Sequence, residues 1–281
     1  MVIPWRGVFP VLSSGAGIAT RVGMLIVQLT DTHCFAAGKS HHSGASPNDA
    51  LATVVDAVNA LEVAPDLVLI TGDIADDAEA AQYESARAGL DRLNAPWRVL
   101  PGNHDDRALM AATFADRDLS TLDDGTLVGA VQDGLVRVLL LDSLVPGLVD
   151  GGLTAAQLGW LETQLTAGSD DGRPVLIALH HPPVARGPEP QLPALDQGRD
   201  ALAALVAAHP VVRLIIAGHY HRSMMGTFGG VPCFVAPSTA FQFGPQVASG
   251  RSSITGEPPG FAIHHWDPGR VGFISHVVAA V

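Results

Sequence analysis

Leu214–His221 has the sequence LIIAGHYH, an apolar run that ends in a glycine and two histidines. Four other apolar runs also end beside side chains that can bind metals: Leu25–Leu29 before Asp31 and His33, Leu67–Thr71 before Asp73, Trp97–Leu100 before Asn103 and His104, and Val175–Leu179 before His180 and His181. Runs of this length and composition predict strands. Because open α/β sheets carry their active sites at the C-terminal ends of their strands, we expect these side chains to share one site.

The chain is long and apolar enough to form a single large α/β domain. It has 281 residues, of which 47% are hydrophobic, so a sizeable core is available. The formal net charge of -12 argues against binding nucleic acid or an anionic membrane over a broad surface. No apolar run reaches the length of a membrane span, so we expect a soluble protein. The two cysteines, Cys34 and Cys233, have no paired spacing, which favours a reducing, cytoplasmic compartment. We expect Cys34 to be packed in the core.

Residues 1–23 differ in composition from the rest of the chain, being rich in Gly and Ser. Pro10 interrupts their apolar stretch, and Arg6 is the only charge before Arg21, which is unlike a secretory signal. We therefore expect residues 1–23 to be an N-terminal extension, either an ordinary leader or the product of an upstream start codon. Residues 24–281 are expected to form one domain.

After Met24, short β-branched runs alternate with longer amphipathic segments, which predicts sheets covered by helices. We expect helices in four places: from Pro47 after an N-cap at Ser46, from Asp77 to Leu93 with Asp76 and Asp77 at its start, after a capping box over Thr154–Gln157, and over Arg199–Ala208. Further strands, joined in part by hairpins, are expected over Arg137–Leu141, Ser223–Phe228, Val231–Val235, Phe261–Trp266 and Val271–Val278. The pattern predicts an α/β fold with two mixed sheets packed face to face, helices outside them, and a long functional loop over residues 241–260.

Seven side chains at the strand ends offer oxygen or nitrogen donors and no thiolate: Asp31, His33, Asp73, Asn103, His180, His219 and His221. Seven donors suggest two metal ions. If Asp73 bridges the ions, eight bonds divide as four per ion, which leaves each ion open to water or substrate, as a catalytic site requires. The i, i+2 spacing in Asp31-x-His33 and in His219-x-His221 lets both side chains of each pair leave an extended segment on the same side.

Several neighbours of these residues have competing interpretations. The glycines Gly72, Gly102 and Gly218 are expected to allow sharp turns beside the ligands. For His181, a structural role and contact with substrate are equally favoured. We expect His41 and His42 to lie in a solvated loop, and the remaining histidines to be structural: His209, His264, His265 and His276.

Taken in order, the five blocks resemble the pattern of the calcineurin-like metallophosphoesterase family: Asp31-x-His33, Gly72-Asp73, Gly102-Asn103-His104-Asp105, His180 and Gly218-His219-x-His221. The resemblance spans residues 31–221 and implies a four-layer α/β/β/α sandwich. It also implies two metal ions, with Asp31, His33, Asp73 and His221 on one, and Asp73, Asn103, His180 and His219 on the other.

Within that family the sequence is most similar to bacterial class III cyclic-nucleotide phosphodiesterases and glycerophosphodiesterases, through Leu29–His33, Pro101–Asp106 and His180–Pro183. This likeness implies hydrolysis of small phosphodiesters and assembly into homo-oligomers. A site of imidazoles and carboxylates without sulfur accepts manganese, iron, cobalt or zinc. Because members of the family often carry iron with manganese or zinc, the resemblance implies these metals.

The mechanism we expect is attack on phosphorus by a hydroxide held between the two ions. Asn103 and His104 would contact the substrate. His104 would protonate the departing alkoxide or stabilise its developing charge, with Asp105 as its candidate orienter. Two alternatives stay open: a phosphomonoesterase or nuclease on the same scaffold, and a non-catalytic interaction protein. Hydrolysis of bis(p-nitrophenyl) phosphate compared with p-nitrophenyl phosphate separates them.

Overall fold

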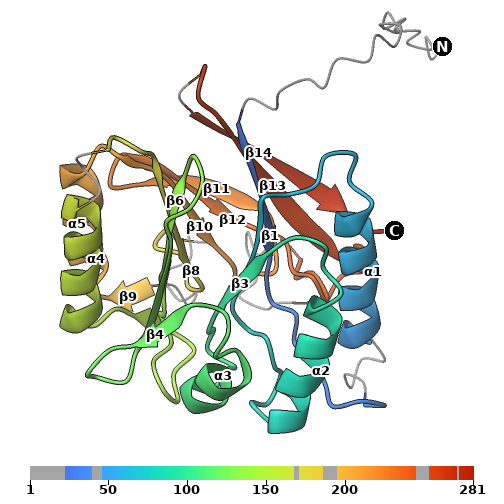
Figure 1. Cartoon of the computed structure of the whole chain (residues 1–281). Helices are drawn as coiled ribbons and strands as arrows, with labels where there is room; N and C mark the ends of the chain where they lie inside the picture. The colour runs from blue at the N-terminus through green and yellow to red at the C-terminus, as the bar shows by residue number, and fades with distance from the viewer. Residues whose placement is uncertain (1–22, 40–45, 168–170, 186–194, 245–252, 271) are drawn as a thin grey trace, which may run out of the picture.

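Two mixed sheets form the centre of the structure, a computed structural model that describes residues 23–39, 46–167, 171–185, 195–244, 253–270 and 272–281 (Figure 1). The five-stranded sheet has the order β14 (Gly272–Ala279), β13 (Gly260–Asp267), β1 (Met24–Leu29), β2 (Leu67–Thr71) and β3 (Trp97–Leu100). The seven-stranded sheet has the order β11 (Met224–Phe228), β12 (Val231–Val235), β10 (Val212–Ala217), β8 (Val175–Leu179), β6 (Arg137–Leu141), β5 (Leu127–Val131) and β4 (Leu119–Thr121). A small separate sheet pairs β7 (Gly151–Gly152) with β9 (Leu195–Gln197).

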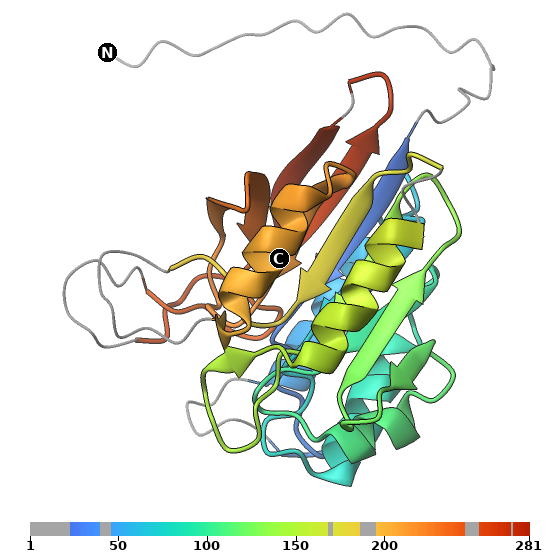
Figure 2. The ribbon, with the colours of Figure 1, turned by 90° about the vertical axis from the view of Figure 1, so that its left-hand side faces the viewer.

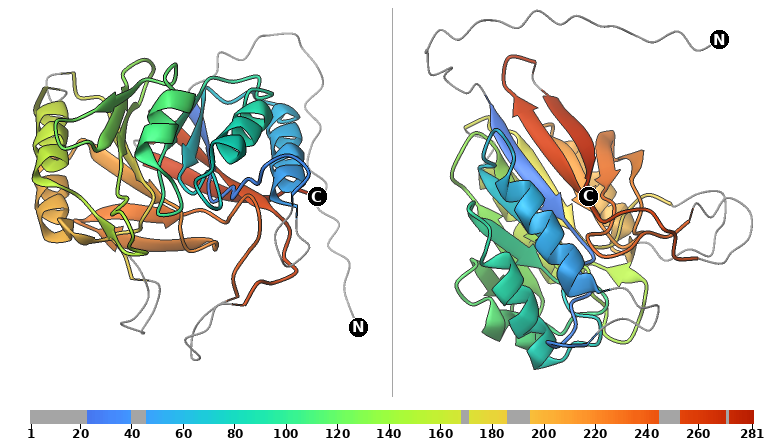
Figure 3. Two further views of the ribbon diagram at one scale, coloured as in Figure 1. Left: turned by 90° about the horizontal axis from the view of Figure 1, so that it is seen from below. Right: turned by 90° about the vertical axis from the view of Figure 1, so that its right-hand side faces the viewer.

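Helices cover the outer face of each large sheet. The five-stranded sheet is covered by α1 (Pro47–Asn59), α2 (Ala80–Leu90) and α3 (Arg107–Thr113), and the seven-stranded sheet by α4 (Ala155–Ala167) and α5 (Arg199–Ala208) (Figures 2 and 3). Alternate residues of β1 face different layers: Val27 packs with α1, whereas Ile26 packs between the two sheets. The predicted four-layer α/β/β/α architecture is therefore confirmed.

The strand directions place the ligand-bearing ends together. β1, β2 and β3 are parallel neighbours in one sheet, and β6, β8, β10 and β12 are parallel neighbours in the other. Every strand in β1–β3 is buried along nearly its whole length, which explains the continuous apolar runs. Since parallel strands end at the same edge of a sheet, the residues after β1, β2 and β3 are neighbours, as are those after β8 and β10.

Most of the predicted helix boundaries hold. The Ser46 side chain accepts a hydrogen bond from the Asp49 N–H at 3.4 Å. Thr154 and Gln157 form the expected reciprocal pair, with bonds of 3.1 and 3.2 Å. The predicted second helix was placed too early, because it begins at Ala80 after the N-cap Glu79 and ends at Leu90. Gln82 instead accepts a bond from the Asp77 N–H at 2.8 Å, which keeps residues 76–78 in a loop.

The sequence pattern did not predict α3, β4, β5, β7 or β9. The described part of the segment between β12 and β13 forms no strand beyond an isolated bridge of Phe243 with Ile254, as expected for the predicted loop. Among the described helices, none combines the length and apolar content required to cross a bilayer. Residues 1–22, His41 and His42 lie outside the described residues, so the predictions for them, and the division into an extension and one domain, stay predictions.

Candidate metal centre

The seven predicted ligands lie together where strands of both sheets end. Five of them are almost completely buried, and Asn103 and His219 are partly exposed. They come from the segments that follow five strands: Asp31 and His33 after β1, Asp73 after β2, Asn103 after β3, His180 after β8, and His219 and His221 after β10. Residues from position 31 to position 221 thus meet in one place, as the sequence predicted.

The backbone at these positions is unusual. Five of the seven residues have positive φ angles, in the left-handed region that side-chain-bearing residues rarely adopt: Asp31 at 52°, His33 at 42°, Asp73 at 51°, His219 at 72° and His221 at 47°. The two loops after β1 and β2 hold one another, with the Asp31 N–H donating to the Gly72 carbonyl and the His33 N–H to the Asp73 carbonyl, both at 2.9 Å. Strained backbone of this kind is typical of functional sites.

The three glycines beside the ligands act in different ways. Gly72 has a φ of 95° and fits the prediction of a sharp turn. Turns also begin at Gly102 and Gly218, without positive φ angles: the Asp105 N–H donates to the Gly102 carbonyl at 3.2 Å, and the Tyr220 N–H to the Gly218 carbonyl at 2.8 Å. These two glycines are required because other side chains approach closely. A Cβ on Gly102 would lie 2.2 Å from Asp73 Oδ1, and a Cβ on Gly218 would lie 1.9 Å from Thr30 Oγ1 and 2.7 Å from Asp31 Oδ2.

The first group of donors consists of Asp31, His33, Asp73 and His221, whose donor atoms all lie within 4.8 Å of one another. His33 Nε2 is 3.0 Å from His221 Nε2 and 3.7 Å from Asp73 Oδ2. His221 Nε2 is 3.3 Å from Asp31 Oδ1. We call these four residues the first cluster.

The second group shares Asp73 with the first. His180 Nε2 lies 3.3 Å from Asp73 Oδ2 and 3.2 Å from Asn103 Oδ1. Asn103 Oδ1 is also 3.0 Å from His219 Nδ1. We call Asp73, Asn103, His180 and His219 the second cluster. The two clusters match the two ligand sets that the family resemblance implied.

The chemistry of the facing atoms fits divalent cations. In His33, His180 and His221, Nδ1 donates outward, to the Asp76 carboxylate at 3.1 Å, the Thr71 carbonyl at 2.8 Å and the Phe241 carbonyl at 2.8 Å, respectively. Once a bound cation has displaced any proton from these rings, each Nε2 presents a lone pair to the cluster. Lone pairs that face each other and carboxylate oxygens repel, and a cation among them turns the repulsion into coordination.

The electrostatics of the residues themselves are strongly perturbed. Burial alone would raise the pKa of Asp31, but the charges of His221 and His180 outweigh it and lower the pKa to about 2. Burial would lower the pKa of His180, yet Asp73 raises it to about 9. Burial and the charge of His180 lower the pKa of His219 to about 3. Shifts of this kind, in opposite directions within one cluster, are typical of functional sites.

His104 lies at the open side of the clusters. Its backbone N–H donates to Asp73 Oδ1 at 2.9 Å, and its ring Nδ1 donates to the Asp76 carbonyl at 2.7 Å. Burial would lower the pKa of His104, but the charge of Asp73 raises it above its ordinary value. The ring is thus held by Nδ1, and Nε2 is the nitrogen left to exchange a proton.

Asp105 does not orient His104, so that prediction is wrong. Its carboxylate accepts bonds from the N–H groups of Gly102 at 2.8 Å and Ile74 at 3.1 Å, and from the Tyr83 hydroxyl at 3.1 Å. Buried acceptors of this kind need such donors. Asp105 therefore joins the loop after β3 to the loop after β2, which carries Asp73.

Asp76 is a site residue that the sequence analysis placed at a helix start. The helix begins only at Ala80, and Asp76 instead uses its carboxylate to hold His33 and its carbonyl to hold His104. A carboxylate behind a ligand histidine fixes its tautomer and ring orientation. The signal that could have revealed it is its position three residues after Asp73, at the end of a buried strand. Cys34 is fully buried, as predicted.

The clusters form the floor of a cleft of about 520 Å³. Its polar lining comes from His33, Asp73, Asp76, Asn103, His104, His219 and His221. Its apolar lining comes from Val149, Phe241, Phe243 and Ile254. The last three belong to the predicted functional loop, whereas Val149 comes from the segment between β6 and β7, which the sequence analysis did not single out.

Carboxylate and imidazole donors from both sheets thus lie together at the floor of an open cleft. This arrangement is typical of proteins that bind cations beside a small ligand. The model of the calcineurin-like phosphoesterase family matches residues 24–223, and the chain belongs to this family. The resemblance inferred from the five sequence blocks is therefore confirmed.

Three curated relatives cover most of this chain. A probable glycerophosphodiester phosphodiesterase of Arcobacter nitrofigilis is 31% identical over 245 residues, which are 86% of this chain and 89% of that protein. A cAMP/cGMP dual specificity phosphodiesterase of Mycobacterium tuberculosis is 32% identical over 82% of this chain and 72% of its own length. A 3',5'-cyclic adenosine monophosphate phosphodiesterase of Pseudomonas aeruginosa is 34% identical over 81% of this chain and 80% of its own.

Solved structures share the fold at lower identity. A dimetal phosphatase from Danio rerio superposes with a TM-score of 0.65 at 17% identity, covering 93% of this chain and 100% of that one. A purple acid phosphatase from yellow lupin gives a TM-score of 0.62 at 13% identity, covering 92% and 54%. These likenesses support the α/β/β/α architecture.

Proposed function

We propose that this protein is a metal-dependent phosphodiesterase that hydrolyses small phosphodiesters, such as a cyclic nucleotide or a glycerophosphodiester. The observation that carries the proposal is the pair of acceptor clusters that share Asp73 on the floor of the cleft. The activities named for the three relatives support it, because all three are phosphodiesterases of small substrates.

In this proposal each cluster would hold one divalent cation, and Asp73 is common to both sets of ligands. When bound, two such cations act as Lewis acids toward the phosphate and supply an acidified water as the nucleophile. The imidazole, carboxylate and amide donors suit manganese, iron, cobalt or zinc. We propose manganese or iron, and elemental analysis of protein purified without added metal identifies the native pair.

Asn103 and His104 are the residues we propose to contact the substrate. Both line the cleft; His104 is exposed and Asn103 is partly exposed, whereas every other ligand except His219 is buried. With His104 Nδ1 committed to the Asp76 carbonyl, His104 Nε2 can give a proton to the alkoxide oxygen as the P–O bond breaks. The raised pKa of His104 favours the protonated ring that this step requires.

The apolar side of the cleft favours a planar group on the substrate. The Phe243 ring stacks on His221 with centroids 4.5 Å apart and planes 22° apart, and Phe241 and Ile254 continue the surface. A nucleobase gains more from contact with such a surface than glycerol does, because more apolar area leaves water. A cleft of about 520 Å³ also lies within the usual range for small-molecule sites. We therefore rank a cyclic nucleotide ahead of a glycerophosphodiester.

The alternatives from the sequence analysis rank lower. A nuclease needs a basic surface for the phosphate backbone, and the net charge of -12 opposes this. A non-catalytic interaction protein has no need to keep seven donor residues together, five of them with strained backbone. A phosphomonoesterase uses the same centre, and only substrate comparison separates it from a diesterase.

The test is a substrate panel on protein of measured metal content. Bis(p-nitrophenyl) phosphate, p-nitrophenyl phosphate, cyclic AMP, its 2',3' isomer and glycerophosphocholine are compared by kcat/KM. We expect turnover of the diesters with cyclic AMP ahead of glycerophosphocholine, and loss of turnover in Asp73→Asn. Exclusive hydrolysis of p-nitrophenyl phosphate, or equal rates without bound metal, overturns the proposal.

A matched pair of variants tests the ranking of substrates. Phe243→Ala is expected to raise KM for cyclic AMP and leave glycerophosphocholine unchanged. The control Phe273→Ala removes a ring on β14 that packs against Trp266, outside the cleft, and is expected to leave both substrates unchanged. An equal fall in kcat/KM for both substrates in Phe243→Ala contradicts the ranking.

Three further proposals concern the whole chain. We propose a cytoplasmic protein, as the soluble-type composition and the relatives suggest, and a homo-oligomer. We also propose that residues 24–281 form one domain that needs no contribution from residues 1–23. Light scattering on the full chain and on a version that begins at Met24 measures the oligomeric state. A diester hydrolysis assay on the same two proteins tests whether activity survives the deletion.

A further inference from the structure

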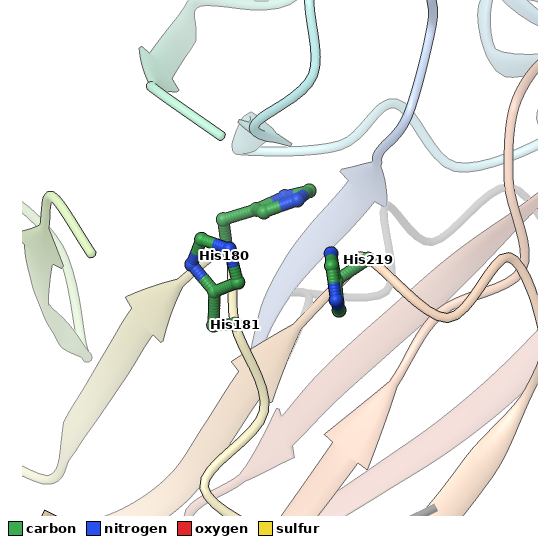
Figure 4. A group of neighbouring side chains, drawn as sticks. All are labelled: His180, His181 and His219. Carbon is green, nitrogen blue, oxygen red and sulfur yellow. The ribbon is translucent and has the colours of Figure 1, made fainter. Parts of the chain in front are cut away.

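His181 is a buried imidazole that belongs to neither cluster. It follows His180 at the end of β8 and is completely buried. Figure 4 shows its ring beside those of His180 and His219, and one ring nitrogen from each of the three lies within 4.8 Å of the others. The ring centroid of His181 is 4.7 Å from that of His219 and 4.8 Å from that of His180. His181 therefore touches both histidines of the second cluster.

The His181 ring is fixed from behind. Its Nδ1 lies 2.8 Å from the Ser143 hydroxyl, which also accepts a bond from the His181 backbone N–H at 3.1 Å. Gly151 leaves no room for the ring to move back, since a Cβ there would lie 2.3 Å from His181 Cγ. Ser143 follows β6 and Gly151 is in β7, so the segment between these strands encloses the ring.

His219 needs such support more than the other ligand histidines do. His33, His180 and His221 each have one ring nitrogen bonded to an oxygen behind the cluster, at Asp76, Thr71 and Phe241. Within the described part of the chain, the only ring hydrogen bond found for His219 is the one toward the cluster, from Nδ1 to Asn103. The orientation of His219 must then come from the rings packed against it.

We propose that His181 is a positioning residue for the second cluster: it holds the His219 ring, by packing, in the orientation that binds a cation. This inference rests on the proposed dimetal function. Ligand histidines without a supporting group lose metal affinity, commonly by about 10- to 100-fold. The same loss is expected here when the His181 ring is removed or displaced, and it is confined to the second cation because His181 contacts no first-cluster ring.

Four variants separate packing from other roles. His181→Ala removes the ring, and Gly151→Ala pushes it toward the cluster. His181→Phe keeps a ring of similar shape and removes the bond to Ser143. His264→Asn is the matched control, since His264 is an equally buried histidine on β13, bonded to Gln28 and Ser275 outside the site.

The readout is manganese binding by the full chain, measured as unbound Mn²⁺ by electron paramagnetic resonance and as bound metal by elemental analysis. Unfolding temperatures in EDTA record any general loss of stability. We expect two cations per chain in the wild type, His181→Phe and His264→Asn. In His181→Ala and Gly151→Ala we expect one cation bound with wild-type affinity and a second whose affinity is lower by about 10- to 100-fold.

Two outcomes overturn the inference. In one, His181→Ala binds both cations with wild-type affinity. In the other, His181→Phe loses the second cation as completely as His181→Ala, which shows that the Ser143 bond rather than ring packing is responsible. Wild-type protein that binds no cation at all overturns the proposed function instead, so the two failures are distinguishable.

Discussion

Replacing His104 by alanine tests the role of the one cluster neighbour proposed to transfer a proton. The substitution leaves the centre itself in place, because the link from His104 to Asp73 Oδ1 is made by the backbone N–H at 2.9 Å. The His104 ring also packs edge-on against His33, with centroids 4.7 Å apart, but His33 keeps its bond to Asp76 when that ring is removed. Metal content is therefore expected to be unchanged.

The expected loss of rate in His104→Ala follows from the role of its ring as a proton donor. The Asp76 carbonyl holds Nδ1 at 2.7 Å and the charge of Asp73 raises the pKa of the ring, so His104 is equipped to act as an acid through Nε2. A positioned general acid contributes about 10²- to 10⁴-fold to the rate. This corresponds to a loss of about 3 to 5 kcal/mol of transition-state stabilisation in His104→Ala.

The assay compares two leaving groups at equal metal loading. The ribose alkoxide released when cyclic AMP opens is a strong base and needs the proton, so kcat for cyclic AMP is expected to fall by the full factor. p-Nitrophenolate is a stable anion that leaves without protonation, so bis(p-nitrophenyl) phosphate is expected to lose much less. His276→Ala, which removes an exposed histidine on β14, serves as the control and should change neither rate.

Equal losses for the two leaving groups would refute the proton-transfer role, since they would indicate a contribution to binding or to orientation of the phosphate. Loss of metal in His104→Ala would refute the separation of this side chain from the centre. Either result is visible in the same set of measurements, because metal content is determined on the protein used for kinetics.

Three further predictions follow from the site and the core. Chelation by EDTA is expected to abolish diester hydrolysis and lower the unfolding temperature, and added manganese to restore both, because a ligand bound only by the folded state stabilises it; recovery of neither contradicts the metal centre. Gly102→Ala would place a methyl group 2.2 Å from Asp73 Oδ1, so it is expected to lose bound metal, whereas Gly159→Ala, with nothing within 4 Å, should retain it. Burial lowers the pKa of His264 from 6.5 to about 3. Below about pH 6.5 the unfolded chain therefore gains a proton that the folded chain does not, so stability falls as pH falls, by about 2 kcal/mol between about pH 7.5 and pH 5 for this group. Urea unfolding should show a smaller difference in the free energy of unfolding between the two pH values in His264→Gln than in the wild type. An unchanged difference contradicts the role given to His264.

The parts of the fold and site that the sequence predicted are those fixed by periodicity and chain direction. A buried strand in a parallel sheet is an uninterrupted apolar run, and parallel neighbours must end at one edge. Asp73 and His180 were therefore each assigned to a C-terminal strand edge, although 107 positions separate them in sequence. Their contact at 3.3 Å lies between the two sheets, because Asp73 follows β2 of one sheet and His180 follows β8 of the other.

The parts that could not be predicted depend on local loop conformation. Asp76 follows a strand and precedes a helix, and an acid is equally suitable at a helix start, so its contact with His33 was not evident. Asp105 was expected to contact the adjacent His104, but the turn after β3 directs it to the backbone of another loop. Gly102 has no special φ, and only the approach of Asp73 explains it.

Short peripheral elements were missed for a related reason. The three residues of β4 and the two of β7 are too few to show a period, and α3 has only seven residues with one buried side chain, Met110. Such elements are stabilised by contacts distant in sequence rather than by their own pattern. The segment before β7 nevertheless supplies Val149 to the cleft, so part of the specificity surface was also hidden.

Anomalous X-ray diffraction from crystals grown with manganese is the decisive test of the dimetal centre. We expect two peaks about 3.5 to 4 Å apart, both in contact with Asp73. One should be completed by Asp31, His33 and His221, and the other by Asn103, His180 and His219. A single peak that does not touch Asp73, or two peaks remote from these side chains, would rule out the proposed centre.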